Sequence, residues 1–386
     1  MKRRAAWFIL FLILAFTSSV SVCFAEDVSL EDEVDREIEE MDLGDFESFV
    51  NDLDSEFFGG MGVKQFVKEL TKGNVDVSVE NVVEKCFSYI IKGIVGAAPF
   101  FTSIILIAVL LSLVLGLTQN FQNKQTVDIV YFVCFAAVVG IVMTLLVKTV
   151  GEVKNVVNSL TNLVNGLFPV LLTLMTALGG NSTAAVFKPQ IAVMCAAVIN
   201  VVSAIVIPLF IVSVVLCVAG NLSSNVKLDK LLSTTRYVAK VVLSFTFGGF
   251  VTYLTIAGIV GGISDGVSVR AAKYLVSNYV PILGGYISQG FDLVAASLTL
   301  IKNALGITGI LAVLAVTLTP VFKLIALTIG FKFTAGLIEP ITDKRMSSFV
   351  NGISECTRAL VGATLGVGFV FIATLMLVIL TLNLVV

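Results

Sequence analysis

Residues 191–219 read IAVMCAAVINVVSAIVIPLFIVSVVLCVA, a stretch of 29 residues without a charged side chain. About 20 consecutive apolar residues are enough for a helix to span the hydrocarbon core of a bilayer. Five further long apolar runs occupy residues 100–117, 127–147, 241–263, 304–329 and 360–386. The sequence therefore predicts an all-α, polytopic helical membrane protein with about six transmembrane helices.

The composition supports lipid as the solvent of most of the chain. Of the 386 residues, 57% are hydrophobic and only 13% are charged, whereas soluble domains carry about 25% charged residues. Histidine is absent, and the six cysteines show no spacing typical of a metal site or a disulfide framework. We find no nucleic-acid-binding motif. The sequence thus offers no candidate for catalytic, metal-binding or cofactor-binding residues, and we expect a protein that is not an enzyme.

The first 25 residues have the pattern of an export signal. Lys2, Arg3 and Arg4 precede an apolar run, and small residues lead to Ala25. This order predicts a signal peptide that is cleaved after Ala25. The alternative is an uncleaved first anchor, and in both cases the following segment is exported.

The exported segment, residues 26–95, begins strongly acidic. Residues 26–56 contain fifteen acidic residues and one base, Arg36. Apolar residues recur there at helical spacing, at Phe46, Phe49, Val50, Leu53 and Phe57. We expect amphipathic helices that form either a solvated tail or a docking face for a partner outside the cytoplasm.

Two weaker apolar runs, residues 160–178 and 279–301, contain prolines and polar residues. They also belong to an internal repeat with an offset of 112 residues, which relates Pro169 to Pro281 and Pro208 to Pro320. We expect the prolines to kink their helices. The predicted units are a first transmembrane hairpin at residues 96–152 and two membrane repeats at residues 153–265 and 266–386.

Basic residues predict which side of the membrane the loops occupy. In the repeat, Leu228-Asp229-Lys230 corresponds to Thr342-Asp343-Lys344. The first of these two loops contains Lys227, Lys230, Arg236 and Lys240, and the equivalent loop of the second repeat contains Lys332, Lys344, Arg345 and Arg358. The positive-inside rule places both loops in the cytoplasm. The two weak runs would then be re-entrant or interfacial segments. An eight-span alternative would place the basic residues 220–240 outside.

Charged residues near the weak runs are the candidate pore or assembly residues: Asp265, Arg270, Lys273, Asp292, Lys302 and Lys323. A lysine at the centre of a membrane costs about 2.5 to 3.5 kcal/mol on insertion scales, so it usually faces water or the bundle interior. Lys323 has the alternative of extending its side chain to the membrane surface.

Residues 163–180 read LVNGLFPVLLTLMTALGG, and residues 262–273 read GISDGVSVRAAK. In these stretches, and in those around residues 302–320, 338–343 and 357–386, the chain resembles the stage III sporulation protein AE family of endospore-forming bacteria. None of them is a catalytic motif.

The resemblance implies a multi-pass protein of the mother-cell membrane that surrounds the forespore. It would belong to a channel or secretion-like complex that is needed for forespore development. The implied partners are the other stage III sporulation proteins, AA to AH, and the forespore's stage II sporulation protein Q. The sequence leaves the oligomeric state open. The alternative function is a stand-alone secondary transporter built from internal repeats.

Overall fold

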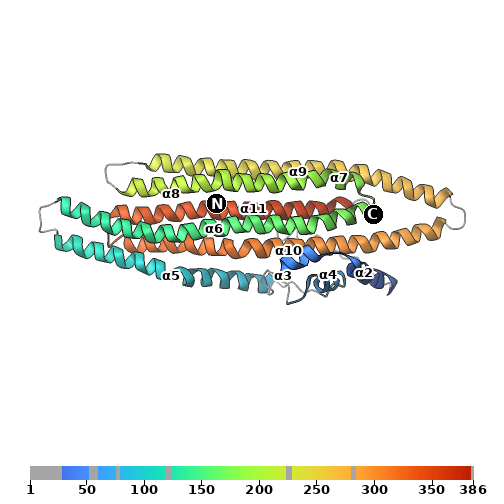
Figure 1. Ribbon diagram of the computed structural model, residues 1–386, viewed down its shortest axis with the longest axis horizontal. Coiled ribbons are helices and arrows are strands. Elements are labelled where there is room, and N and C mark those ends of the chain that lie inside the picture. The colour runs from blue at the N-terminus through green and yellow to red at the C-terminus, as the bar shows by residue number, and fades with distance from the viewer. Residues whose placement is uncertain are drawn as a thin grey trace.

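The computed structural model describes residues 28–51, 60–74, 79–118, 124–222, 228–279 and 284–383. All regular structure in these ranges is helical, which confirms the expected fold class. Most helices lie side by side in one elongated bundle (Figure 1). Its rods are α5 (Val79–Thr118), α6 (Lys124–Ala177), α9 (Asp229–Tyr279), α10 (Gly284–Ile338) and α11 (Lys344–Asn383). A further rod joins α7 (Asn181–Val201), a π-helical segment (Val202–Val206) and α8 (Ile207–Leu222).

Five helical stretches of the described residues are long and apolar enough to cross a membrane. They are Ser88–Leu117, Val127–Ala177, Asn181–Leu222, Asp292–Ile338 and Lys344–Leu380. These stretches support the expected multi-pass membrane protein. The remaining predicted span, residues 241–263, lies on α9, and its side chains from residue 257 onwards fall outside the described part.

The rods alternate in direction, so the connections gather at two ends of the bundle (Figure 1). At one end, here called the basic end, α5 meets α6, α8 meets α9, and α10 meets α11. The Tyr131 hydroxyl of α6 donates to the Asn221 carbonyl oxygen of α8 at 2.8 Å, and the Arg345 guanidinium of α11 lies 3.9 Å from the centre of the Tyr131 ring. Both predicted basic loops therefore lie at the same end, as the six-span topology requires.

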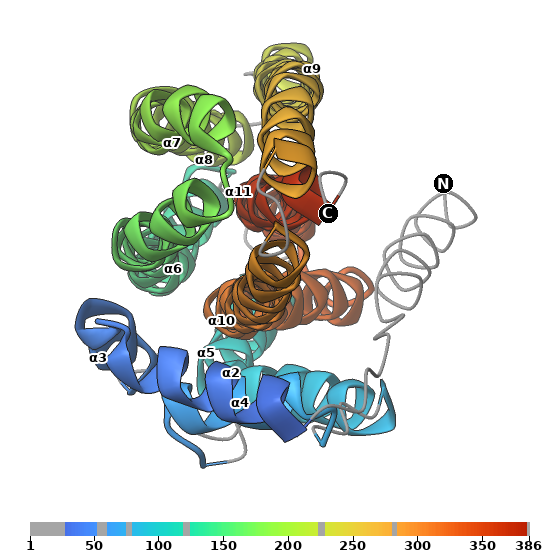
Figure 2. The ribbon, with the colours of Figure 1, turned by 90° about the vertical axis from the view of Figure 1, so that its right-hand side faces the viewer.

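Helices α10 and α11 lie in the middle of the bundle, with α9 on one side, α5 on the opposite side and α6, α7 and α8 on a third (Figure 2). Buried leucine, valine and phenylalanine side chains fill the interfaces along their length. Close helix contacts require glycine at several positions. A side chain at Gly330 would meet the ring of Phe101 on α5, and a side chain at Gly366 would meet the ring of Phe247 on α9.

The re-entrant alternative for residues 160–178 is wrong, whereas the interfacial alternative stays a prediction. This run continues α6 through Pro169 to Ala177 without interruption. Its apolar residues recur at intervals of three and four and are all buried: Leu160, Leu163, Val164, Leu167, Phe168, Leu171, Leu174 and Met175. Packing of this stripe maintains the helix although proline removes one backbone hydrogen bond. The second weak run likewise enters a long helix, because residues 284–301 form the start of α10.

A tight turn reverses the chain between α6 and α7. Gly179 has a φ of 85°, a left-handed conformation that glycine adopts without strain. The Gly180 N–H donates to the Met175 carbonyl oxygen at 2.8 Å, and the Gly179 N–H donates to that of Thr176 at 3.0 Å. These bonds cap the end of α6, so α6 and α7 form a helical hairpin.

The first helices fold onto the end of the bundle opposite the basic end. We call α2 (Val28–Glu40), α3 (Gly44–Asn51) and α4 (Val63–Thr71) the platform, and this end the platform end (Figure 1). Acidic α2 pairs with basic α4. Lys68 Nζ lies 2.8 Å from Glu39 Oε1, and Lys72 Nζ lies 3.1 Å from Asp35 Oδ2. The acidic segment is thus partly neutralised within the platform.

The predicted unit boundaries after residues 95, 152 and 265 fall inside α5, α6 and α9, so no linker separates the units. The internal duplication remains a prediction. Its paired motifs occupy equivalent places, because Asp229 begins α9 and Asp343 immediately precedes α11 at the same end of the bundle.

Candidate functional site: a charged layer in the apolar half of the bundle

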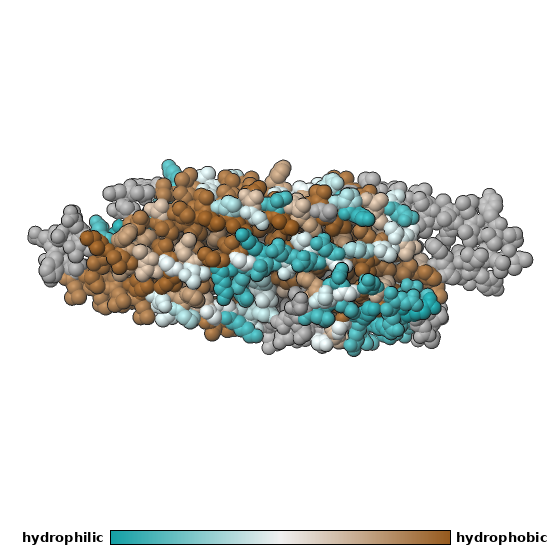
Figure 3. Space-filling view, in the orientation of Figure 1, coloured by the Kyte–Doolittle hydropathy of each residue, from teal (hydrophilic) through white to brown (hydrophobic). Residues whose placement is uncertain are grey.

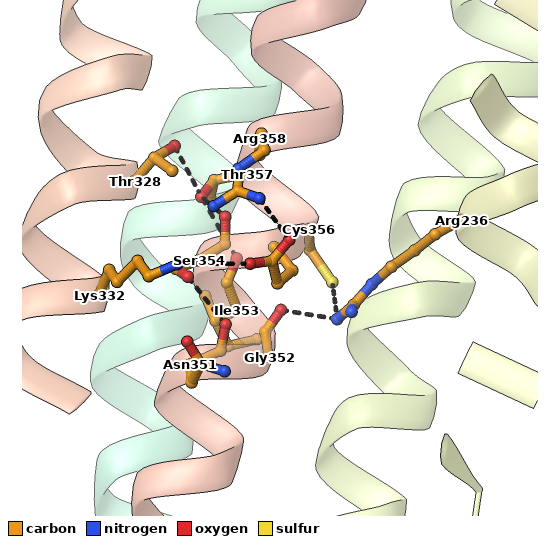
Figure 4. A network of polar contacts seen from close by, with 11 residues as sticks. Arg236, Thr328, Lys332, Asn351, Gly352, Ile353, Ser354, Cys356, Thr357 and Arg358 are labelled. Carbon is orange, nitrogen blue, oxygen red and sulfur yellow. Dashed lines mark hydrogen bonds and ion pairs between the residues drawn. The ribbon is translucent and has the colours of Figure 1, made fainter. Parts of the chain in front are cut away.

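Three charged side chains form a network between α10 and α11. Lys332 Nζ lies 3.9 Å from Glu355 Oε1, and the Arg358 guanidinium lies 2.9 Å from Glu355 Oε2 (Figure 4). The exposed fractions of the Lys332, Glu355 and Arg358 side chains are 59%, 30% and 53%. We call these residues the ion triad. It carries one excess positive charge on an outer face of the single chain.

The triad lies on two helical stretches, Asp292–Ile338 and Lys344–Leu380, that are long and apolar enough to cross a membrane. Lys332 is six residues from the end of α10 and Arg358 fourteen from the start of α11, or about 9 and 21 Å at 1.5 Å per residue. The hydrocarbon core is about 30 Å thick. The same two helices also expose apolar side chains, at Ile329 and Phe333 of α10 and, two turns beyond Arg358, at Leu365 of α11. Charged side chains inside transmembrane segments normally face a partner or water.

A third cation lies on the other side of α11. Arg236 of α9 donates to the Gly352 carbonyl oxygen at 2.8 Å, and its guanidinium lies 3.4 Å from Cys356 Sγ (Figure 4). The ion pairs of the described residues do not include Arg236. Its charge is therefore stabilised in this structure by backbone and sulfur dipoles, which fix α9 against α11.

The expectation that Arg236, Lys332 and Arg358 belong to basic loops is wrong. All three lie inside helices, because α9, α10 and α11 extend further towards the basic end than the apolar runs alone indicate. Lys230 and Lys344 are exposed in the first turns of α9 and α11. Sequence reasoning also missed Glu355. Its signal was its position three residues before Arg358, a spacing at which oppositely charged side chains meet on a helix.

The predicted pore or assembly residues do not form one cluster. Lys302 is buried and its Nζ donates to the Ile379 carbonyl oxygen at 3.0 Å. Lys323 is half-exposed and pairs with Glu152 of α6 at 3.7 Å. These two lysines are 21 residues apart on α10, or about 31 Å. Asp292 is exposed. The side chains of Asp265, Arg270 and Lys273 lie outside the described part.

Three of the predicted proline kinks fall on described residues. Pro169 and Pro320 lie within continuous α6 and α10, and Pro208 follows the π-helical segment at the start of α8. Pro281 lies outside the described residues. Pro169 also lines a groove of about 560 Å³ between α6 and α7, together with Asn165, Thr173 and Lys188.

The predicted docking face is largely occupied within the chain. Phe46 and Val50 of α3 are buried, and Phe49 packs partly against the same core. A side chain at Gly166 would lie 3.3 Å from the Phe46 backbone nitrogen, so α3 rests directly on α6. The structure therefore gives these apolar residues an intramolecular partner. Leu53 and Phe57 lie outside the described residues.

Comparisons with known proteins give one consistent result. Residues 61–381 match the family defined as stage III sporulation protein AE. The chain is also similar to the stage III sporulation protein AE of Bacillus subtilis (strain 168), at 23% identity over 339 residues. That alignment covers 87% of this chain and 85% of the relative. No solved structure matches the chain.

Proposed function

Because the chain belongs to the stage III sporulation protein AE family, we propose that it is a membrane subunit of the mother-cell-to-forespore channel or secretion-like complex. In this role it supports forespore development from the mother-cell membrane around the forespore. Its partners are the other stage III sporulation proteins, AA to AH, and stage II sporulation protein Q. The subunit acts by assembly and transport rather than by catalysis.

Beyond membership of the family, the ion triad is the observation that supports a role in assembly or transport. Lys332 and Arg358 are both more than half exposed, although they lie on helical stretches that are long and apolar enough to cross a membrane. A stable surface of this kind needs either a complementary partner or a water-filled path. Both are supplied by a multiprotein membrane complex. The excess positive charge favours a partner segment, or a path, with acidic character.

The platform supports the same proposal from the other end. Its exposed acids include Glu31, Glu40, Asp42 and Asp45, whereas its apolar residues are packed on the bundle. An exported platform would present this charged surface rigidly between the two membranes. It would thereby offer a fixed contact face to other proteins of the complex.

The test compares Lys332→Glu with Lys344→Glu in a sporulating strain that carries the variant as its only copy. Lys344 is an exposed lysine in the first turn of α11 and serves as the matched control. We expect Lys332→Glu to reduce co-purification of the partner proteins and spore yield at least tenfold, at unchanged abundance of the chain. Equal spore yield and co-purification for the two variants would contradict the role of the triad.

Reconstitution separates this proposal from the stand-alone transporter. The purified chain alone in liposomes should give no substrate flux above that of empty liposomes. Flux by the isolated chain would favour the transporter, and normal sporulation after deletion would contradict the subunit role.

A further inference from the structure

The exposed face of α6 changes character halfway along the helix. Up to Val147 its exposed residues include Phe132, Val133 and Met143, with exposed fractions of 55%, 61% and 37%. From Lys148 to the end of α6 the exposed residues are Lys148, Lys154, Asn155, Asn158, Asn162, Asn165, Pro169, Thr173, Thr176 and Ala177. The first half thus presents a surface suited to lipid and the second half a surface suited to water.

The buried face of α6 does not change in the same way. Leu146, Val153 and Val156 continue into the apolar stripe that begins at Leu160, and all are buried. A single helix with a constant packing face therefore passes from one solvent to another. Its 54 residues extend about 81 Å, far more than the roughly 30 Å of a hydrocarbon core.

Lysines on neighbouring helices lie at the level of this change. Lys323 of α10 pairs with Glu152 of α6, one turn beyond Lys148. A side chain at Gly93 of α5 would lie 3.5 Å from the Lys323 Cα atom, which places exposed Lys92 at the same level. Lysines are favourable beside phosphate headgroups, where their stems remain in the apolar region.

On the opposite side of the bundle the apolar surface reaches further towards the platform end. Phe247 of α9 contacts Gly366 of α11, and nearby Gly368 contacts Thr317 of α10. Thr317 is six residues nearer the platform end than Lys323, or about 9 Å. Beyond Phe247, α9 still exposes Tyr253 and Ile256, at 55% and 59%.

The apolar surface ends earlier on the α6 side than on the α9 side, and both boundaries fit one bilayer if the bundle is inclined in it. At the basic end, α5 and α6 extend beyond α8 and α9, as an inclined slab of constant thickness requires (Figure 1). Apolar side chains cover the basic-end part of the visible face, and hydrophilic ones gather towards the platform end (Figure 3). Inclinations of up to about 40° occur among transmembrane helices.

We propose that the bundle crosses the membrane inclined and only with its basic-end half, and that phospholipid headgroups bind at the level of Lys92, Lys148 and Lys323. The second half of α6 and the first part of α7 then stand in water as a projecting hairpin. The platform is attached to this projecting half. The inference concerns the position of the chain in lipid and does not depend on the proposed function.

Single cysteines in a full-length chain without its six native cysteines test the proposal. Asn158→Cys and Thr173→Cys lie on the polar half of α6, and Val133→Cys on the apolar half. Tyr253→Cys and Ile256→Cys test the opposite edge. Each variant is reconstituted in liposomes of phosphatidylethanolamine and phosphatidylglycerol and treated with a 5-kDa polyethylene glycol maleimide. The liposomes are made permeable to the reagent without dissolving the bilayer, so that the reagent reaches both faces. The extent of labelling is compared with full labelling in denaturant.

We expect Asn158→Cys and Thr173→Cys to react at least tenfold faster than Val133→Cys, Tyr253→Cys and Ile256→Cys. Protection of Asn158→Cys and Thr173→Cys would overturn the projecting hairpin. Reaction of these two with a small maleimide but not with the large one would also overturn it, since it would indicate a narrow pore within the bilayer. Fast reaction of Tyr253→Cys and Ile256→Cys would overturn the inclination. Circular dichroism before labelling identifies variants that fail to fold. Asn162→Cys and Asn165→Cys replace Asn158→Cys or Thr173→Cys in that case.

Discussion

The guanidinium of Arg236 donates a hydrogen bond of 2.8 Å to the carbonyl oxygen of Gly352, and this contact joins α9 to the central helix α11. The same guanidinium lies 3.4 Å from Cys356 Sγ. Hydrogen bonds from charged donors contribute about 1.5 to 3 kcal/mol. Arg236 therefore connects the periphery of the bundle to its centre.

Replacement of this arginine by lysine should loosen α9. We expect Arg236→Lys to lower the free energy of unfolding by about 1 to 3 kcal/mol, because the ammonium group lacks the planar, preformed donor arrangement of arginine. Thermal unfolding in detergent measures the effect. Lys240→Arg, an exposed exchange one turn further along α9, is the control and should leave the unfolding temperature unchanged. Equal unfolding temperatures for both variants would show that the contact contributes nothing.

The backbone of Gly352 lies directly against the Cys217 sulfur atom of α8. Gly352→Ala should destabilise the protein by about 1 to 3 kcal/mol, since an added methyl group overpacks this contact. The double variant Gly352→Ala with Cys217→Ala should recover part of the loss. Gly362→Ala is the matched control, because open space surrounds that position. A double variant that is as unstable as the sum of its two single variants would refute the explanation by contact.

The platform should depend on pH through its ion pairs. The hydrogen bond from Lys68, assisted by the charge of Lys68, lowers the pKa of Glu39 below its usual 4.5. The hydrogen bond with Asp35 raises the pKa of Lys72 above its usual 10.5. The Glu39 pair therefore stabilises the platform above pH 4.5 and is lost as the pH falls through the lowered value. The stability linked to the raised pKa of Lys72 is fully present below pH 10.5 and is lost as the pH rises through the raised value.

Limited proteolysis of the full chain between pH 3.5 and 11 measures this window. Cleavage within α2 and α4 should be slowest between about pH 5 and 10, after correction for the protease's own pH profile. Glu39→Gln should weaken the acidic edge of the window and leave the alkaline edge in place. An unchanged acidic edge in that variant would contradict the assignment to Glu39.

Asp343 caps the start of α11. Its Oδ1 accepts the Arg345 backbone N–H at 2.8 Å, and its carboxylate also binds the Arg345 guanidinium. Burial raises the pKa of Asp343, but the hydrogen bonds from Arg345 outweigh burial and leave the pKa below its usual 3.8. Loss of an N-cap costs about 0.5 to 2 kcal/mol. We expect this loss for Asp343→Ala in chemical unfolding at pH 7, with the difference from wild type vanishing as the pH falls well below 3.8.

Sidedness can be tested with exposed positions at the two ends. Cysteine introduced at Ser233 or Lys344, at the basic end, should react with an impermeant maleimide only after the cytoplasm is opened. Cysteine introduced at Ser48, in the platform, should react in cells whose membrane is intact and whose wall lets the reagent pass. Labelling of the Ser233 position from outside would invert the assigned topology.

Hydropathy and charge were sufficient to predict that this protein is a polytopic helical membrane protein. Long uncharged runs such as residues 191–219 require lipid, whatever their neighbours are. The same reasoning predicted that both basic loops lie at one end, because the paired motifs around Asp229 and Asp343 imply an even number of crossings between them. These conclusions rest on the preference of each segment for lipid or water, which depends only on the segment's own residues.

Only the tertiary structure decided what the weaker segments do. Residues 160–177 remain helical because a buried stripe packs against other helices, an effect that local sequence around Pro169 cannot reveal. Phe46 is buried because α6 lies beneath it, and Lys323 finds its counter-ion in Glu152, 171 residues earlier in the chain. Burial and ion pairing are properties of two surfaces in contact, so the partner of each residue became known only when the helices were placed together.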